Sequence, residues 1–294
     1  MDLKGKLIAQ LEQWNKEQKD LKEKLIIIEN KDSSSEAFDV ENIKLVGGVD
    51  ISFAQNPDDK VHACAALVVI SLPDLKVEYQ SCTFVHLTSP YIPEYLAFRE
   101  ASYLVCELGK LKQNKPELFP QVLLVDGNGL LHPRGFGVAC HIGVLADLPT
   151  VGVAKQLFHV GGLEKNEEHT EKISTMLVNA GDSFQLMSES NTVLGEAFKS
   201  TQDTRKPIYI SVGHKISLHN AVKIVGKCCK YRIPEPVRQA DIISREYMRN
   251  NYEILVQDCQ VDWKGISKQH EEIEELAKRL KMQSIVNAVE VSEL

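Results

Sequence analysis

Three carboxylates lie at positions where a charged side chain needs a partner. Asp50 interrupts the apolar segment VGGVDISF, and Asp126 ends the apolar segment VLLVD, just before Gly-Asn-Gly. Glu100 follows the apolar residues LAF on a segment with helical periodicity. Isolated burial of a carboxylate is costly, so each of these groups must be paired, hydrogen-bonded or bound to a metal ion.

Taken singly, each carboxylate also has a simple structural explanation. Asp126 fits a turn, Asp50 fits a β-bulge, and Glu100 has Arg99 beside it as an ion-pair partner. Taken together, they predict three carboxylates at one edge of a sheet, where ligands of α/β proteins gather. Two carboxylates about 4 Å apart repel by roughly 4 kcal/mol at an effective dielectric near 20. A divalent cation removes that repulsion, and an all-oxygen ligand set favours Mg²⁺ or Mn²⁺ over zinc.

The elements that must position these groups indicate an α/β fold. Short turn segments between the first three strands favour antiparallel hairpins, and a helix and a strand then alternate. We therefore predict a mixed central sheet, three antiparallel strands and then parallel strands, flanked by helices. The expected strands are 44–53, 62–71, 76–87, 121–129, 149–155, 192–200 and 207–213. The expected helices are 6–28, 93–112, 135–148, 217–229, 234–250 and 268–281, whereas 159–191 gives no clear pattern.

Composition sets the broad class. The chain has 294 residues, of which 43% are apolar and 26% are charged, which excludes collagen-like and wholly disordered chains. No run of about 18 apolar residues is present, so we expect no membrane span. The N-terminus is too polar for a signal peptide, and we expect an intracellular protein. Its seven cysteines form no C-x-x-C pair, so the sequence does not support a zinc module and favours reduced thiols.

The charge is unevenly distributed. The formal net charge is −7, which is not typical of a nucleic-acid-binding protein. The segment from Arg205 to Arg249, however, holds ten basic and three acidic residues. Such a block suits a phosphate backbone, although a solvated helix surface explains it equally simply.

The sequence resembles the endonuclease V family, the inosine-specific nucleases with an RNase H-like fold. The similar segments span about residues 44–241 in the family's order, and each is several residues long. They are VGGVDISF, SPYIPEYLAFRE, VLLVDGNGLLHPRGFGVACHIGV, PTVGVAK, ISVGHKIS and RIPEPVRQAD. The longer terminal parts resemble an animal member. The resemblance implies a catalytic domain over residues 1–250 and an acidic extension, partly helical or disordered, over 251–294.

The resemblance also implies catalytic roles. It makes Asp50, Glu100 and Asp126 the metal ligands, with Mg²⁺ as the expected ion and Mn²⁺ as a substitute. Asp241 matches a position near the metal, and Lys155 matches one near the scissile phosphate or the attacking water. These five residues are the predicted catalytic set.

For the substrate, the resemblance implies a wedge and a base pocket. The wedge, which enters where the lesion base leaves the stack, comprises Pro90, Tyr91, Ile92 and Pro93. The family often has glycine where this chain has Glu94. The pocket residues and one residue at the site edge are Leu96, Gly127, Asn128, Gly129, His132 and His214. In the light of the resemblance, we expect part of the basic block to contact nucleic acid.

The implied reaction is metal-dependent hydrolysis of the second phosphodiester bond 3′ to inosine, leaving 3′-hydroxyl and 5′-phosphate ends. Animal members resemble ribonucleases, so single-stranded inosine RNA is the expected substrate. Two alternatives stay open: a deoxyinosine-specific DNA repair enzyme, and a non-catalytic reader of inosine RNA. A phosphate-binding G-x-x-x-x-G-K-[ST] loop is absent, which argues against an unrelated phosphotransferase. We expect a monomeric cytoplasmic protein, with a nuclear or nucleolar pool left open.

Overall fold

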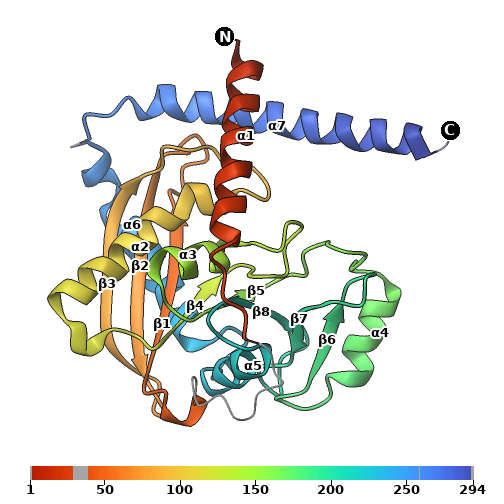
Figure 1. Ribbon diagram of the computed structural model, residues 1–294. Coiled ribbons are helices and arrows are strands. Elements are labelled where there is room, and N and C mark those ends of the chain that lie inside the picture. Colours follow the sequence, from red (N-terminus) through yellow and green to blue (C-terminus); the bar gives the residue numbers. More distant parts are fainter. Residues whose placement is uncertain (1, 29–38, 258, 293–294) are drawn as a thin grey trace.

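The computed structural model describes residues 2–28, 39–257 and 259–292, with side chains described up to residue 281. Its centre is an eight-stranded sheet in the order β3-β2-β1-β4-β5-β8-β7-β6 (Figure 1). The strands are β1 (Leu45–Phe53), β2 (His62–Ser71), β3 (Lys76–His86), β4 (Val122–Asp126), β5 (Thr150–Ala154), β6 (Ser183–Met187), β7 (Val193–Phe198) and β8 (Ile208–His214).

The strand directions confirm the predicted mixed sheet. β1, β2 and β3 form an antiparallel meander, while β4 pairs parallel to β1 and β5 pairs parallel to β4. β8 then runs antiparallel to β5, and β7 and β6 continue that antiparallel pairing. Since β1, β4 and β5 share one direction, Asp126 at the end of β4 lies at the same edge as the residue that follows β5.

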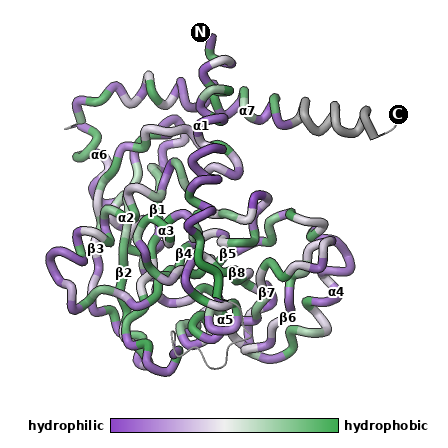
Figure 2. Tube along the Cα trace, viewed as in Figure 1, coloured by the Kyte–Doolittle hydropathy of each residue, from purple (hydrophilic) through white to green (hydrophobic). Residues whose placement is uncertain are grey.

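Helices cover both faces of the sheet. One face carries α5 (Leu218–Lys227) and α6 (Glu235–Gln257), and the other carries α2 (Leu96–Asn114) and α3 (Val138–Ala146). Figure 2 shows apolar residues concentrated along the central strands, as expected for strands buried on both faces. β2 illustrates this, because all its residues except the last are buried.

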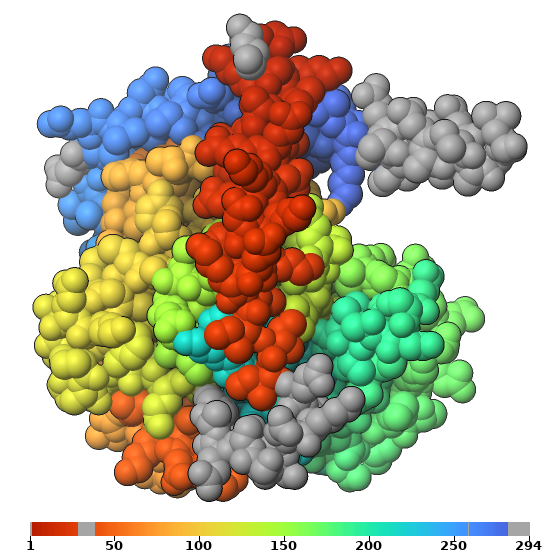
Figure 3. Space-filling view, in the orientation of Figure 1, coloured from red at the N-terminus to blue at the C-terminus, as the bar shows by residue number. Residues whose placement is uncertain are grey.

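Two long helices lie outside these layers. α1 (Leu3–Lys22) packs against α3, and α7 (Trp263–Ser292) crosses α1. In Figure 3, α1 lies on the surface, with α7 visible on both sides of it. An apolar cluster holds the two helices to the segment before α2, through Leu7, Trp14, Ile92, Tyr95 and Ala277.

Several element boundaries differ from the sequence prediction. α2 starts at Leu96 rather than 93, because Glu94 has a left-handed backbone with φ of 73°. Residues 159–191, left unassigned, contain α4 (Glu167–Met176) and β6. α6 continues to Gln257, past the predicted domain boundary at 250, and residues 293–294 lie outside the described residues.

Short 3-10 turns lie at Val40–Asn42 and Pro116–Leu118. Within the part of the chain described here, no helix has the length and apolar character needed to cross a membrane.

Candidate active site

The structure brings the predicted carboxylates to one edge of the sheet. Asp50 lies on β1, Asp126 ends β4, and Glu100 lies in the second turn of α2. Each of the three is partly buried. Both Asp50 and Asp126 act electrostatically on Glu100, so the three groups form one cluster of like charge.

Asp50 is held from the α6 side. Its Oδ2 accepts a hydrogen bond from Ser244 Oγ at 3.1 Å, and Ser244 in turn lies 2.7 Å from Ser52 Oγ. α6 comes this close because residue 48 is glycine: a Cβ there would lie 2.1 Å from the carbonyl carbon of Pro236. Burial, and then the charges of Asp126 and Asp241, raise the pKa of Asp50 to about 6.

Glu100 is the most strongly perturbed acid of the cluster. Burial raises its pKa to about 8, and the negative charges of Asp50 and Asp126 add to that rise, although Arg99 opposes it. Arg99 is turned away by its own contacts, because its guanidinium donates to the carbonyls of Ser89 and Lys60. The Arg99 pair considered from sequence therefore does not neutralise Glu100.

Lys155 supplies the positive charge of the site. Its Nζ lies 2.5 Å from Asp126 Oδ2. Although burial acts to lower the pKa of Lys155, the charge and hydrogen bond of Asp126 outweigh it and raise that pKa. Arg232 fixes the segment that carries this lysine, since its Nη2 donates to the Lys155 carbonyl at 2.7 Å and to the Pro207 carbonyl at 3.0 Å.

These groups line a cleft of about 460 Å³. Asp50, Asp126, Lys155 and Asp241 are on its walls, together with Arg245 of α6. Asp241 pairs with Arg245 at 2.7 Å. Glu100 does not line the cleft, and it is coupled to it through the charges of Asp50 and Asp126, which help to raise its pKa.

The predicted wedge is only partly exposed. Tyr91 has 45% of its surface accessible, whereas Ile92 is 5% accessible and packs with Leu7 and Trp14 of α1. The backbone N–H of Tyr91 donates to Glu274 Oε1 of α7 at 2.8 Å. The structure therefore presents Tyr91 to solvent and uses Ile92 as an anchor. Pro90 and Pro93 are partly buried beside them.

Glu94, where the family often has glycine, keeps its left-handed backbone through side-chain contacts. Its Oε2 accepts from Arg134 Nη1 at 2.9 Å, and its Oε1 lies 2.5 Å from Lys281 Nζ. Arg134 also stacks on Tyr95, with the guanidinium carbon 4.1 Å from the ring centroid. Arg134 lies within one of the segments that resemble the family, but the sequence assigned it no role. The structure shows that it joins the wedge segment to the pocket loop.

The predicted base pocket begins at the turn after Asp126. Gly127 has a φ of 144°, and a Cβ on it would lie 2.5 Å from Val138 Cγ1. A Cβ on Gly129 would lie 2.0 Å from the Val212 carbonyl oxygen. Asn128 Oδ1 is buried without a hydrogen-bond partner among the described residues. The turn thus combines tight backbone packing with one unused acceptor.

His132 lies further along the same loop. Burial and then the charge of Arg134 lower its pKa to about 4, so the ring is neutral near pH 7. Its ring centroid lies 5.9 Å from that of Phe158, which follows Lys155 in the chain. Leu96, the first residue of α2, is partly buried.

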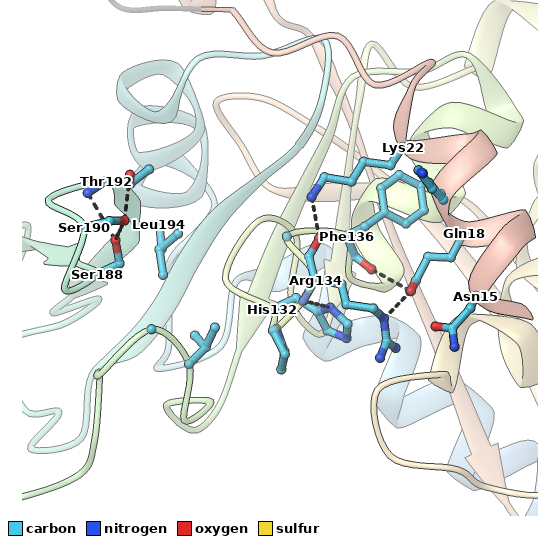
Figure 4. A pocket seen from close by; sticks show the side chains of 15 residues that line it. Asn15, Gln18, Lys22, His132, Arg134, Phe136, Ser188, Ser190, Thr192 and Leu194 are labelled. Atoms are coloured by element: carbon cyan, nitrogen blue, oxygen red, sulfur yellow. Dashed lines mark hydrogen bonds between the residues drawn. The ribbon is translucent and has the colours of Figure 1, made fainter. Parts of the chain in front are cut away.

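His132 and Arg134 also line a cavity of about 720 Å³ (Figure 4). One wall comes from α1, where Lys22 donates to the Arg134 carbonyl and Gln18 contacts both Phe136 and Arg134. In Figure 4 the hydroxyl groups of Ser188, Ser190 and Thr192 stand on the opposite side. Basic groups on one wall and hydroxyl groups on the other suit a phosphate-bearing chain.

His214 is not brought to the catalytic cleft. It pairs with Thr150 at the start of β5, whereas Lys155 follows the other end of that strand. Its Nδ1 accepts from the Ile26 backbone N–H at 3.2 Å. Part of the basic block forms ion pairs within the protein. Lys215 pairs with Asp147, and Lys227 pairs with Glu41.

The donor set of the cleft fits a hard divalent cation. Asp50 and Asp126 offer carboxylate oxygens, and Glu100 adds a third carboxyl group that is coupled to both. Repulsion from neighbouring carboxylates adds to the rise in the pKa values of Asp50 and Glu100 that burial causes, and Lys155 does not offset it at Asp50. A cation such as Mg²⁺ would relieve the same repulsion through ligands of the type it prefers.

The fold and this cleft define a nuclease of the RNase H-like class. The Endonuclease V family model matches residues 26–242, and the chain belongs to that family. Human Endonuclease V is 51% identical over 242 residues, covering 81% of this chain and 83% of that protein. Mouse Endonuclease V is 51% identical over 240 residues, covering 80% and 69%.

A solved structure from a sea squirt extends the comparison. Ciona intestinalis Endonuclease V was crystallised in complex with a 23mer DNA containing an inosine followed by a ribo-adenosine. It superimposes with a TM-score of 0.75 at 38% identity, covering 82% of this chain and 98% of that chain. The catalytic domain of human Endonuclease V superimposes with a TM-score of 0.79 at 48% identity, covering 83% and 98%.

Proposed function

We propose that this protein is a metal-dependent endonuclease that recognises inosine, preferably in single-stranded RNA. It hydrolyses the second phosphodiester bond 3′ to the inosine and leaves 3′-hydroxyl and 5′-phosphate ends. The observation that carries this proposal is the cleft itself, in which Asp50 and Asp126 meet Lys155 and are coupled electrostatically to the buried carboxyl group of Glu100. That combination suits cleavage of a phosphodiester better than simple binding of one.

In this proposal Asp50, Asp126 and Glu100 hold Mg²⁺, for which Mn²⁺ substitutes. When bound, the ion lowers the pKa of a water and reduces the negative charge on the phosphate. Lys155 donates a hydrogen bond to a phosphate oxygen in place of its contact with Asp126, and Arg232 keeps the Lys155 segment in position. Asp241 orients a water at the cleft wall, where Arg245 fixes its carboxylate.

Base recognition follows from the turn after Asp126. Hypoxanthine carries a carbonyl where adenine carries an amine, so a hydrogen-bond donor aimed at that position from the loop after Asp126 favours it over adenine. The unused Asn128 Oδ1 accepts from a ring N–H of the base. A buried polar group left unpaired costs about 1–3 kcal/mol, which is the source of discrimination. The exposed Tyr91 ring stacks in the space that the extruded base leaves, worth roughly 1–3 kcal/mol.

Deoxyinosine DNA is the second candidate substrate. The sea-squirt relative was crystallised with DNA containing an inosine followed by a ribo-adenosine. That ligand has a ribonucleotide directly after the inosine, which supports recognition of a 2′-hydroxyl next to the lesion in this chain. The 2′-hydroxyl is the group by which a protein distinguishes RNA from DNA.

One set of labelled strands tests these alternatives. Single-stranded RNA with one inosine, the same sequence in DNA with one deoxyinosine, a DNA strand with one ribonucleotide after the lesion, and matched guanosine and adenosine strands are incubated with Mg²⁺. We expect cleavage of the inosine RNA and of the mixed strand one nucleotide past the lesion. Equal cleavage of the all-DNA strand would favour repair, and tight binding without cleavage would leave an inosine reader.

We propose a monomer, because one chain supplies every predicted catalytic residue of the cleft. We propose a cytoplasmic location with a nuclear or nucleolar pool, in keeping with an RNA substrate. Fractionation of cells that express the tagged protein, combined with light scattering of the purified protein, tests both.

A further inference from the structure

A second group of metal-binding side chains lies at the outer edge of the sheet, away from the carboxylate cleft. His62 begins β2, His86 ends β3, and the two residues face each other in the strand register. Cys259 joins them from the segment that follows α6. We call these three residues the histidine–cysteine cluster. None of them lines the carboxylate cleft.

The three ligand atoms are already close together. One nitrogen of each histidine and the sulfur of Cys259 all lie within 4.8 Å of one another, and Cys259 Sγ is 3.1 Å from His86 Nε2. Ligand atoms of a tetrahedral zinc ion are separated by roughly 3.3–3.7 Å, as follows from its bond lengths of about 2.0–2.3 Å. Small side-chain rotations would therefore place all three around one ion.

The surroundings of His62 orient its ring for this purpose. Asp59 Oδ2 lies 2.7 Å from His62 Nδ1, and Tyr252 donates its hydroxyl to the same oxygen at 2.7 Å. A histidine that binds a metal through one ring nitrogen commonly donates the other to a carboxylate in this way. The remaining nitrogen, His62 Nε2, is buried and has no hydrogen-bond partner among the described residues. A buried nitrogen of this kind points to a ligand.

Aromatic rings surround His62, whereas His86 and Cys259 are partly exposed. The ring centroids of Phe84 and Trp263 lie 5.1 and 5.7 Å from that of His62, and that of Tyr252 lies 6.3 Å away. Such rings limit the access of solvent to an ion. Imidazole and thiolate donors favour zinc over the oxygen-seeking Mg²⁺ of the cleft.

We propose that His62 Nε2, His86 Nε2 and Cys259 Sγ bind one Zn²⁺, with water as the fourth ligand. Cys259 binds as the thiolate, and its proton passes to solvent. The ion ties the chain after α6 to the edge of the sheet. Because α7 starts at Trp263 and contacts Tyr91 and Glu94 further along, the site fixes the helix that braces the wedge segment.

Metal content and a cobalt spectrum test the proposal on the full chain. The purified protein is dialysed against metal-free buffer, analysed for zinc by mass spectrometry, and then titrated with Co²⁺ after the zinc has been removed. We expect one retained zinc per chain, and with Co²⁺ a thiolate charge-transfer band together with tetrahedral d–d bands. No cysteine lines the carboxylate cleft, so it does not produce the thiolate charge-transfer band.

Two ligand variants, one variant of the residue that orients His62, and one control identify the site. We expect Cys259→Ser and His86→Gln to weaken zinc binding by more than roughly 100-fold, and Asp59→Asn, which acts through His62, to weaken it by roughly 10–100-fold. Cys106→Ser, which removes an exposed cysteine on α2, leaves binding unchanged. Circular dichroism of the metal-free variants confirms that each is folded.

Three results would overturn the proposal. They are a wild-type protein without bound zinc that gives no charge-transfer band, a Cys259→Ser variant that keeps both, and a Cys106→Ser variant that loses them. The proposal is independent of the nuclease reaction, because a cleavage failure would leave the metal analysis unaffected.

Discussion

The carboxylate cleft and the histidine–cysteine cluster lie on the same sheet, yet the electrostatic surroundings of their ligand atoms differ. In the cleft, burial and then the repulsion of neighbouring carboxylates raise the pKa values of Asp50 and Glu100. In the cluster, a ring nitrogen of His62 is buried without a partner among the described residues. The cleft is therefore suited to an exchangeable hard cation used in chemistry, and the cluster to a softer ion that is held permanently.

The largest expected effect tests whether the cleft carboxylates are essential for cleavage. Replacing Asp126 by Asn removes a ligand charge and the partner of Lys155 at once. We expect the cleavage rate of inosine RNA at saturating Mg²⁺ to fall by at least about 10³-fold. Single-turnover assays measure this, with Asp74→Asn in the exposed β2–β3 turn as the matched control. A fall of less than tenfold would contradict the assignment of the cleft.

The positive charge of the cleft is the next test. Lys155→Met keeps the length and apolar stem of the side chain and removes the ammonium group. We expect the rate to fall by about 10²–10³-fold, with little change in KM, because the charge acts chiefly on the transition state. Lys172→Met on α4 is the control. If only KM changed, we would instead infer that Lys155 binds the substrate without acting on the transition state.

The cluster is expected to act on stability. An ion that binds only the folded chain at 100 times its Kd stabilises it by about 2.7 kcal/mol. Removing zinc should therefore lower Tm by roughly 5–10 °C, and adding it back should restore Tm in the wild type and in Cys106→Ser. Scanning calorimetry of Cys259→Ser should show neither effect. A large zinc-dependent shift in the Tm of that variant would show that the stabilising ion binds elsewhere than at the cluster.

The smallest expected effect is a gain in the stability of the folded protein when Glu100 is replaced by glutamine. Because the pKa of folded Glu100 is about 8, well above its usual 4.5, the folded state binds the proton more tightly than the unfolded state. Without divalent cations, stability therefore falls as pH rises from about 4.5 through 8. Glu100→Gln removes this loss, so we expect greater stability than the wild type at pH 8 and little change at pH 4.5. Urea unfolding with Glu164→Gln as control measures it, and equal stabilities at pH 8 would contradict the raised pKa.

The sequence predicted the mixed sheet and the meeting of Asp50, Asp126 and Lys155, because Asp126 and Lys155 lie at the ends of neighbouring strands and Asp50 interrupts an apolar strand beside them. It did not reveal which wedge residues are exposed, since Ile92 is buried by α1 and α7, helices distant in the chain. His214 stays away from the cleft because the register of β8 places it beside Thr150. The histidine–cysteine cluster escaped detection because its ligands come from three separated segments without a spacing signature.

The packing of α7 over the wedge segment also bears on the solubility of shortened forms of the chain. Ile92, Tyr95 and Trp14 share one apolar cluster with Ile273, Leu276 and Ala277 of α7. Ending the chain after α6 would leave that cluster facing water as a contiguous apolar patch, and such patches promote self-association. A proteolytic fragment that keeps every catalytic residue would then differ from the whole protein in colloidal behaviour.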